Sequence, residues 1–529
     1  MSRVLVVTAD VLRRQMAGPA MRAWHIAARL AGEHEVRLVT TSRHCEVKGE
    51  GFEAAPVTPE GLEEAASWAD IVVLQGYTTY HNPNLVELDK FMVFDVYDPL
   101  HLETLALTKG ASGPARDWHV RASVETLNQQ LRRADFLMCA TERQRDLFIG
   151  QLCALGRANP RTYDEDPTLR RLIDVVPFGL PDISPVHRRP ALRGVVPGIG
   201  ATDDIIVWAG GLYDWFDPLT LVHAVASLAK RRPSVRLFFM GLRHPNPDVP
   251  EMQVVAQTRA LASELGVAGK HVFFNEGWVD YADRENFLLE ATVGVTTHFD
   301  SVETRYSFRT RALDYLWAAL PMVTTRGDSF AELVEAEGMG FSVPPQDPDA
   351  LEDALARLLY DKELAERCRA RAAAVRKRFR WSVVLQPLEQ FCRQPRRAPD
   401  LAAGDAYFAL QLPGTTGAST TAGEQASPGG GPTSTTQATL QGANGTEPAS
   451  DKPPANDQEP TNDKEPTNDK ERAATNLLPA NDQAPAATMT LWQLARHHYR
   501  EGGLSQVALR AAQKAHRMVR DKQLRRRAR

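Results

Sequence analysis

The feature that most constrains this chain is a double series of short apolar runs, separated by segments with helical periodicity. The first series comprises residues 4–8, 35–40, 70–75, 91–96, 134–139 and 175–181. After a Pro-, Arg- and Gly-rich connector at 184–202, the second comprises 204–208, 235–240, 271–274, 293–297 and 321–325. Short buried strands that alternate with helices predict parallel sheets covered on both faces. The sequence therefore predicts two α/β domains in tandem, with a small-molecule cleft between them.

The domain boundaries follow from this pattern and from a change in composition. We expect the first α/β domain at 1–185, the second at 200–378 and a closing helix at 379–395. Residues 409–491 contain no Phe, Tyr or Trp and are rich in small and polar residues. Such a segment cannot bury enough apolar surface to offset its chain entropy, so 403–488 is predicted to be a disordered linker.

The last segment, 489–529, is predicted to be a basic helical tail. Between 491 and 529, eleven Lys and Arg residues are opposed only by Glu501 and Asp521, and Trp492 and Leu494 lie among them. A basic amphipathic helix can bind an anionic membrane surface, each cation contributing about 1 kcal/mol. A contact with nucleic acid or an acidic protein and a merely solvated helix are the alternatives.

Net charge, cysteine spacing and the lengths of the apolar runs indicate the cellular compartment and the kinds of partner to expect. The net charge of −4 argues against a surface built for nucleic acid, and we expect no nucleic-acid partner for the catalytic part. The five cysteines are scattered without metal-ligand spacing. No run approaches the ~18 apolar residues of a membrane span, and the N-terminal run is too short for a signal peptide. We therefore expect a cytoplasmic protein, held peripherally at the inner face of the plasma membrane if the tail binds it.

The segment 303–321 carries the most chemistry. A loop that holds Glu303 and three arginines (Arg305, Arg309 and Arg311) follows a predicted strand, and Asp314 lies inside the next helix. Loop amides, a helix N-terminus and three guanidinium groups form an anion site, and Asp314 could accept both hydroxyls of a ribose. The alternative is that these charges only cap the helix and pair on its surface.

This segment resembles the sugar-nucleotide motif of the retaining family 4 (group 1) glycosyltransferases of bacteria, which have the GT-B fold. The resemblance implies two Rossmann-like domains, the first on the acceptor side and the second binding the donor. It also implies that Asp314 is the family's second acid, which holds the ribose. Tyr306 occupies the position of the first acid, so Glu303 is the expected substitute with a catalytic role.

Three other stretches resemble the same family. Gly18 lies in a loop like the one where the sugar diphosphate approaches the backbone, although a plain turn is the alternative. Gly210 and Gly211 match the turn that opens the donor domain. The family's phosphate-binding Lys is missing after that turn, so the arginines of 305–311 are expected to hold the diphosphate. The stretch Gly277, Trp278 and Val279 resembles the loop that meets the nucleobase.

Asp98, His101 and Glu103 follow a strand of the first domain. They could face the acceptor sugar and polarise its hydroxyl group, or they could cap the next helix. Asp95 and Asp98 are three residues apart and so do not form the D-x-D motif of metal-dependent transferases. The resemblance to GT-B enzymes therefore implies neither a metal nor a cofactor beyond the nucleoside diphosphate sugar substrate.

The sequence thus predicts a metal-independent transferase that moves a sugar from a nucleotide sugar to an acceptor with retention. A cell-envelope glycan or a glycolipid is the expected acceptor. A phosphorylase of the same fold would need a lysine for pyridoxal phosphate, and none lies near 303–314. Two alternatives stay open: a sugar-nucleotide epimerase of the same fold, and a non-catalytic scaffold that retains the fold.

Overall fold

The computed structural model describes residues 1–110, 112–247, 249 and 251–402, which all belong to one structural unit of the chain. The predicted linker at 403–488 and the predicted basic tail at 489–529 lie outside the described residues.

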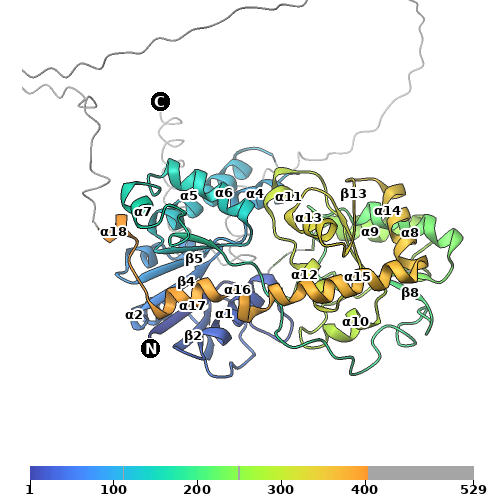
Figure 1. Cartoon of the computed structure of the whole chain (residues 1–529), viewed down its shortest axis with the longest axis horizontal. Coiled ribbons are helices and arrows are strands. Elements are labelled where there is room, and N and C mark those ends of the chain that lie inside the picture. Colours follow the sequence, from blue (N-terminus) through green and yellow to red (C-terminus); the bar gives the residue numbers. More distant parts are fainter. Residues whose placement is uncertain (111, 248, 250, 403–529) are drawn as a thin grey trace, which may run out of the picture. The chain divides into compact units, whose positions relative to one another are not determined.

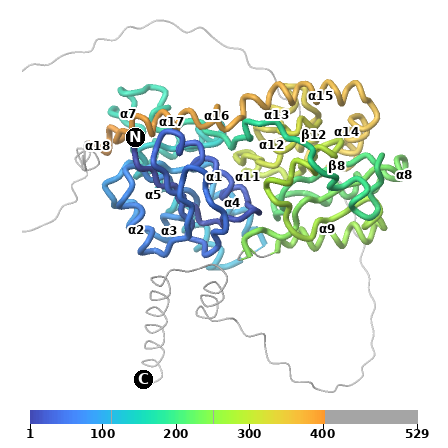
Figure 2. The backbone as a smooth tube through the Cα atoms, turned by 90° about the horizontal axis from the view of Figure 1, so that it is seen from below, coloured from blue at the N-terminus to red at the C-terminus, as the bar shows by residue number. Residues whose placement is uncertain are grey.

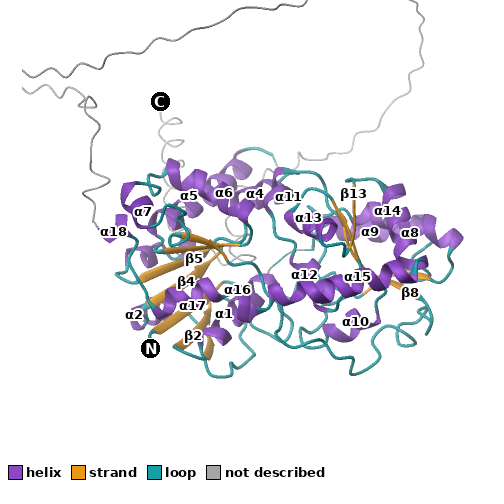
Figure 3. Ribbon diagram, in the orientation of Figure 1, coloured by secondary structure: helices purple, strands orange, loops and turns teal. Residues whose placement is uncertain are grey.

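The first lobe is built on a parallel sheet with the strand order β3-β2-β1-β4-β5-β6-β7. Its strands are β1 (Arg3–Thr8), β2 (Glu35–Thr40), β3 (Glu53–Pro56), β4 (Ile71–Gln75), β5 (Phe91–Asp95), β6 (Phe136–Cys139) and β7 (Ile173–Val175). Its helices are α1 (Gly18–Leu30), α2 (Pro59–Trp68), α3 (Thr78–His81), α4 (Leu100–Leu107), α5 (Pro114–Arg133), α6 (Glu142–Ala154) and α7 (Pro160–Glu165). Helices lie on both sides of this sheet (Figure 3).

The second lobe repeats the plan with the parallel order β10-β9-β8-β11-β12-β13. Its strands are β8 (Asp204–Trp208), β9 (Val235–Phe239), β10 (Val272–Phe274), β11 (Val293–Thr296), β12 (Met322–Thr325) and β13 (Gly340–Val343). Its helices are α8 (Pro218–Arg231), α9 (Gln253–Glu264), α10 (Arg284–Glu290), α11 (Val302–Tyr306), α12 (Thr310–Trp317), α13 (Ser329–Ala336), α14 (Pro348–Tyr360) and α15 (Lys362–Val375). The two parallel sheets confirm the predicted fold class (Figure 1).

The buried faces of both sheets explain why these segments are strands. Almost every residue of β1, β4, β6, β8 and β12 is buried, and most of them are β-branched or aliphatic. Such continuous apolar runs are typical of parallel strands with helices on both faces.

The chain returns to the first lobe at its described end. After a short 3-10 turn at Arg376–Phe379, α16 (Trp381–Val384), α17 (Gln386–Arg393) and α18 (Pro399–Ala402) run back to α7 (Figure 2). The region predicted as one closing helix at 379–395 is therefore interrupted. Pro387 in the first turn of α17 lacks an N–H donor and its ring opposes a helix continuing from α16.

Ion pairs hold this returning segment on the first lobe. Arg393 Nε contacts Glu33 Oε2 at 2.6 Å, and Arg157 Nε contacts Asp400 Oδ2 at 2.5 Å with both side chains fully buried. The first lobe thus consists of two separate stretches of sequence, one that precedes the second lobe along the chain and one that follows it.

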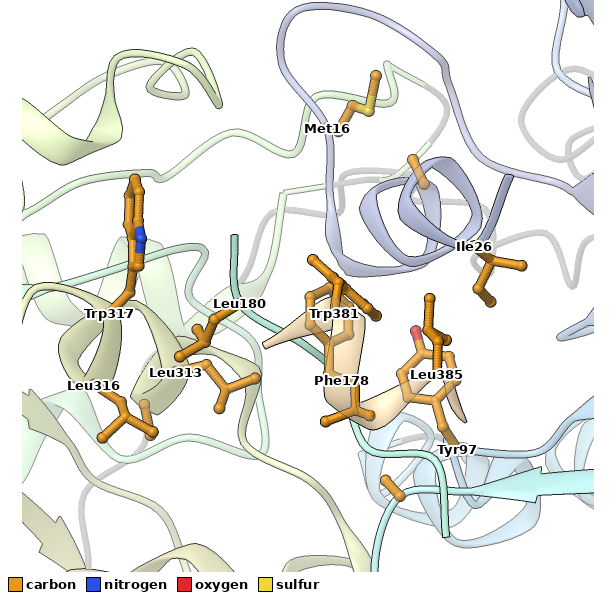
Figure 4. Packing of buried hydrophobic residues seen from close by; sticks show 14 of the residues in the cluster. Met16, Ile26, Tyr97, Phe178, Leu180, Leu313, Leu316, Trp317, Trp381 and Leu385 are labelled. Atoms are coloured by element: carbon orange, nitrogen blue, oxygen red, sulfur yellow. The ribbon is translucent and has the colours of Figure 1, made fainter. Parts of the chain in front are cut away.

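An apolar cluster joins the two lobes where the chain crosses between them. Trp381 stacks on His25 of α1 and packs against Phe178, with ring centroids 4.8 and 5.1 Å apart. Figure 4 shows Trp381 and Phe178 together with Leu313 and Trp317 of α12. Gly179 lies so close to the Trp381 ring that a Cβ atom at this position would overlap it.

Candidate active site

A cavity of about 360 Å³ is lined by loops from both lobes. Its lining residues follow the carboxyl ends of β1, β5 and β7 in the first lobe and of β8 to β11 in the second. The strand order reverses beside β1 in one sheet and beside β8 in the other. Open α/β sheets bind ligands at these switch points, so the topology itself places a ligand site here.

Arg311 is a buried cation on the cavity wall. Its side chain lies over the rings of Phe216 and Trp208, with Cζ 3.9 and 4.1 Å from their centroids, and its Nη2 donates to the Gly211 carbonyl at 2.6 Å. The other terminal nitrogen, Nη1, is buried without a hydrogen-bond partner among the described residues. Burial lowers the pKa of Arg311 to about 10, which leaves it charged at neutral pH. A buried cation with a free donor at a cavity fits an anionic group.

Arg309 also lines the cavity, but a carboxylate holds most of its donors. Its two terminal nitrogens each donate to one oxygen of Glu303 at 3.0 Å. Its Nε lies 3.7 Å from Asp328. The bidentate pair with Glu303 fixes the guanidinium plane, and Glu303 itself does not line the cavity.

Asp314 faces the cavity one turn of α12 beyond Arg311. It accepts a hydrogen bond from Arg284 Nε at 3.0 Å, and Arg284 in turn lies over the Tyr281 ring at 3.6 Å. The next residue, Tyr315, fixes the helix that carries both charges: its hydroxyl accepts from the Ala209 N–H at 2.9 Å and donates to the Val295 carbonyl at 2.7 Å.

Two backbone turns open on the cavity from opposite lobes. Gly18 begins α1, whose N-terminus has no side-chain cap. Gly210 follows β8 with φ of +74°, a conformation that favours glycine. The N-terminus of a helix binds anions through free N–H groups, so the Gly18 turn offers a place for a phosphate. At Gly210, the lack of a side chain lets a ligand approach the backbone.

Aromatic rings occupy the place where the missing Lys was expected. Tyr213 and Trp215 stack with their centroids 4.9 Å apart and an interplanar angle of 3°, and both line the cavity. His244 lies beside Tyr213 and Trp278, at 6.3 and 5.9 Å between centroids. The cavity wall therefore has a broad apolar face next to the guanidinium group of Arg311.

Two carboxyl groups face the cavity from the first lobe, one before α4 and one in its first turn. Burial raises the pKa of Asp98 to about 7, and burial together with Asp98 and Glu303 raises the pKa of Glu103 well above its usual range. His101 lies on the same helix, and burial lowers its pKa. Its side chain does not line the cavity.

The cavity thus brings together most of the residues predicted from the sequence. It is lined by Gly18, Asp98, Gly210, Gly211, Trp278, Val279, Arg309, Arg311 and Asp314. Outside its lining are His101, Gly277, Glu303 and Arg305. Arg305 is exposed on α11, and the Gly277 carbonyl accepts from the Leu242 N–H. The assignment of roles to these residues stays a prediction.

Sequence reasoning missed Arg284, Tyr213 and His244 as lining residues. Arg284 begins a short helix far along the chain from Asp314, and no spacing signal links the two residues. The sequence does contain three aromatic residues at 213–216, and they stand where the family's phosphate-binding Lys is expected.

The described residues hold no group of three or more His, Cys, Asp or Glu side chains placed to bind a metal ion. None of the described helices combines the length and apolar character that crossing a membrane requires.

The second lobe matches a known protein family. Residues 203–361 match the family described as glycosyl transferases group 1. A D-inositol 3-phosphate glycosyltransferase of Saccharomonospora viridis is 25% identical over 300 residues, which are 56% of this chain. The match covers 64% of that relative's own length.

Solved structures match the fold of both lobes. A sucrose-phosphate synthase from Thermosynechococcus elongatus superposes with a TM-score of 0.55 at 15% identity, over 76% of this chain and 100% of the other. Anabaena HepE in complex with UDP-glucose gives 0.52 at 14% identity, over 74% and 100%. At these identities the likeness concerns the fold, which is the two-lobed GT-B arrangement.

Proposed function

Because residues 203–361 form a group 1 glycosyltransferase domain within a GT-B fold, we propose that this protein transfers a sugar from a nucleoside diphosphate sugar to an acceptor hydroxyl group. The proposal includes retention of configuration at the anomeric carbon and catalysis without a metal ion. It is supported by the family match, by the likeness to a fold that binds UDP-glucose in Anabaena HepE, and by the charge of the cavity.

The observation that carries the proposal is Arg311. A buried guanidinium with a free Nη1 lines the cavity, and Asp314 lies one turn further on the same helix. These two groups suit two neighbouring parts of a nucleoside diphosphate. The cation can bind the diphosphate, and the carboxylate can accept hydrogen bonds from the ribose hydroxyl groups. Negative charge develops on the leaving diphosphate in the transition state, and a preorganised cation there lowers the barrier.

The other expected catalytic residues receive narrower roles. Asp98 faces the cavity from the first lobe and is the candidate to contact the acceptor hydroxyl. Glu303 acts through Arg309, whose guanidinium it holds in place, and is therefore proposed as a positioning residue. His101 stays a prediction from the sequence, because its side chain does not line the cavity.

The acceptor class and the membrane role rest on the sequence. A cell-envelope glycan or glycolipid at an anionic membrane surface would suit the eleven cations of 491–529. Full-length protein should sediment with anionic liposomes at low salt, and the protein ending at residue 402 should not. Equal sedimentation of the two forms would remove the membrane proposal.

A donor screen tests the enzymatic proposal. Nucleotide sugars are added singly to the full-length protein, and thermal stabilisation and slow release of nucleoside diphosphate are measured, with and without EDTA. We expect at least one donor to stabilise the protein and to be hydrolysed at an unchanged rate in EDTA. The Asp314→Ala variant should bind the same nucleotide more weakly by about 1.5–3 kcal/mol. No stabilisation by any donor would favour a non-catalytic scaffold.

A further inference from the structure

The two walls of the cavity carry different kinds of ionisable group. All three of its arginines, Arg284, Arg309 and Arg311, come from the second lobe. The first-lobe wall contributes Asp98 and Glu103, and none of its lining residues at 16–21, 97–103 and 178–181 is Lys, Arg or His. A ligand that spans the cavity therefore meets cations at one end and carboxyl groups at the other.

The carboxyl groups of the first-lobe wall lack counter-ions. Among the residues that the structure describes, no Lys, Arg or His nitrogen lies within 4 Å of either carboxylate. Asp95, only three residues before Asp98, shows the contrast: Arg22 donates to its two oxygens at 2.5 and 2.8 Å. The cations whose charges act on these two carboxyl groups are paired elsewhere: Arg309 is held by Glu303, and Arg22 is held by Asp95. In the described part of the chain, Asp98 and Glu103 therefore form no direct ion pair, and the hydroxyl group of Tyr97 is the side-chain partner of Asp98.

We propose that the acceptor carries an ammonium group beside its reacting hydroxyl group, and that Asp98 and Glu103 bind this ammonium group. The inference rests on the proposed function, because it takes the second-lobe wall as the donor site. The buried, unpartnered Nη1 of Arg311 independently marks the same cavity as a ligand site. An amino sugar or an aminocyclitol has the required chemistry.

The proposal follows from the energetics of buried charge. Burial of a carboxylate that has no ion-pair partner is costly, and burial is the main reason why the pKa values of Asp98 and Glu103 are raised. An ammonium group between them stabilises both ionised forms and forms charge-assisted hydrogen bonds. A phosphorylated acceptor would instead add like charge to this wall, and a neutral sugar would gain only ordinary hydrogen bonds.

Three matched sugars test the charge preference directly. Glucosamine, glucose and glucose 6-phosphate are titrated calorimetrically at pH 6.5 into full-length protein saturated with the nucleoside diphosphate found in the donor screen. We expect glucosamine to bind at least tenfold more tightly than glucose, and glucose 6-phosphate more weakly than glucose. In the Asp98→Asn/Glu103→Gln double variant, glucosamine and glucose should bind alike.

A second double variant in the same lobe, Glu142→Gln/Asp146→Asn, removes two exposed carboxylates outside the cavity and should keep the preference. Thermal unfolding of each variant verifies that it is folded. Equal affinities for the three sugars in the wild-type protein, no measurable binding of any of them, or tightest binding of glucose 6-phosphate would overturn the inference. If no nucleoside diphosphate binds in the first place, the proposed function fails instead, so the two failures are distinguishable.

Discussion

At the scale of single residues, Arg311 and Arg305 make a matched pair. Both were expected to bind the diphosphate, but Arg311 is buried at the cavity and Arg305 is exposed on α11. We expect Arg311→Met to weaken nucleoside diphosphate binding by about 1.5–3 kcal/mol and to lower turnover more than tenfold, because a charged hydrogen bond is lost. Arg305→Met should change neither quantity by more than twofold. Similar losses in both variants would show that the loop, and not Arg311, supplies the charge.

Asp98 predicts a pH dependence of stability. Its pKa is raised to about 7 by burial, whereas an unfolded aspartate has a pKa of about 3.9. Between these values the folded protein holds a proton that the unfolded chain has lost, so the free energy of unfolding falls as the pH rises. The difference in melting temperature, Asp98→Asn minus wild type, should therefore increase from about pH 4 to pH 7. Above pH 7 this difference should stay constant.

The exposed residue Asp146 on α6 supplies the control for this measurement. Asp146→Asn should follow the wild-type melting temperature across the same interval. An Asp98→Asn curve that also stays parallel to the wild type between pH 4 and pH 7 would contradict the assigned proton.

At the scale of elements, the contact between β11 and α12 positions the second-lobe wall of the cavity, where we propose that the donor binds. A Cβ atom on Gly294 would lie 2.5 Å from Cδ1 of Tyr315, the residue that anchors α12. We expect Gly294→Ala to lower the free energy of unfolding by about 1–3 kcal/mol through overpacking, and to weaken nucleotide binding because α12 carries Arg311 and Asp314. Urea denaturation measures the first effect and calorimetry the second.

Gly150→Ala offers the same chemical change in α6, where a Cβ atom would meet open space. It should stabilise the protein by about 0.5–1 kcal/mol. Equal stabilities of the two variants would show that the sheet yields at Gly294 and that α12 is not fixed by this contact.

Sequence patterns predicted the strands that lie in the middle of each sheet. The predicted runs at 35–40 and 204–208 coincide with β2 and β8, because their apolar residues are buried from end to end. The edge strands β3 and β13 were missed because they are only partly buried, whereas the short edge strand β10 coincides with the predicted run at 271–274. The helix that carries Asp314 is confined to Thr310–Trp317, because the preceding loop at 307–309 turns to bring Arg309 against Glu303.

The site was predictable only where a local motif carried it. Asp314 and Gly210 belong to short patterns, and both line the cavity. The pairing of Arg309 with Glu303 and of Arg284 with Asp314 depends on how loops fold back on one another. The spacing of residues along the chain does not predict such contacts. The sequence therefore could not show that Arg309 and Arg284 form ion pairs whereas Nη1 of Arg311 has no partner among the described residues.

At the scale of the whole molecule, the described C-terminal segment completes the first lobe. Arg157 is fully buried, and its ion pair with Asp400 is the only one recorded for it among the described residues. A protein ending at residue 402 should unfold at the temperature of the full-length protein. A protein ending at residue 394 lacks Asp400 and leaves the Arg157 charge uncompensated, which should cost about 3–5 kcal/mol. Identical unfolding of the two truncated forms, measured by calorimetry, would contradict this account.

The same arrangement sets an order of events during biosynthesis. A ribosome produces the whole second lobe before it reaches α17 and α18, so that lobe can finish folding while the first, although begun earlier, is still incomplete. Glu33 and Arg157 cannot form their ion pairs until Arg393 and Asp400 are translated, more than two hundred residues later. A nonsense codon or a proteolytic nick shortly before residue 402 therefore damages the half of the enzyme that was synthesised first.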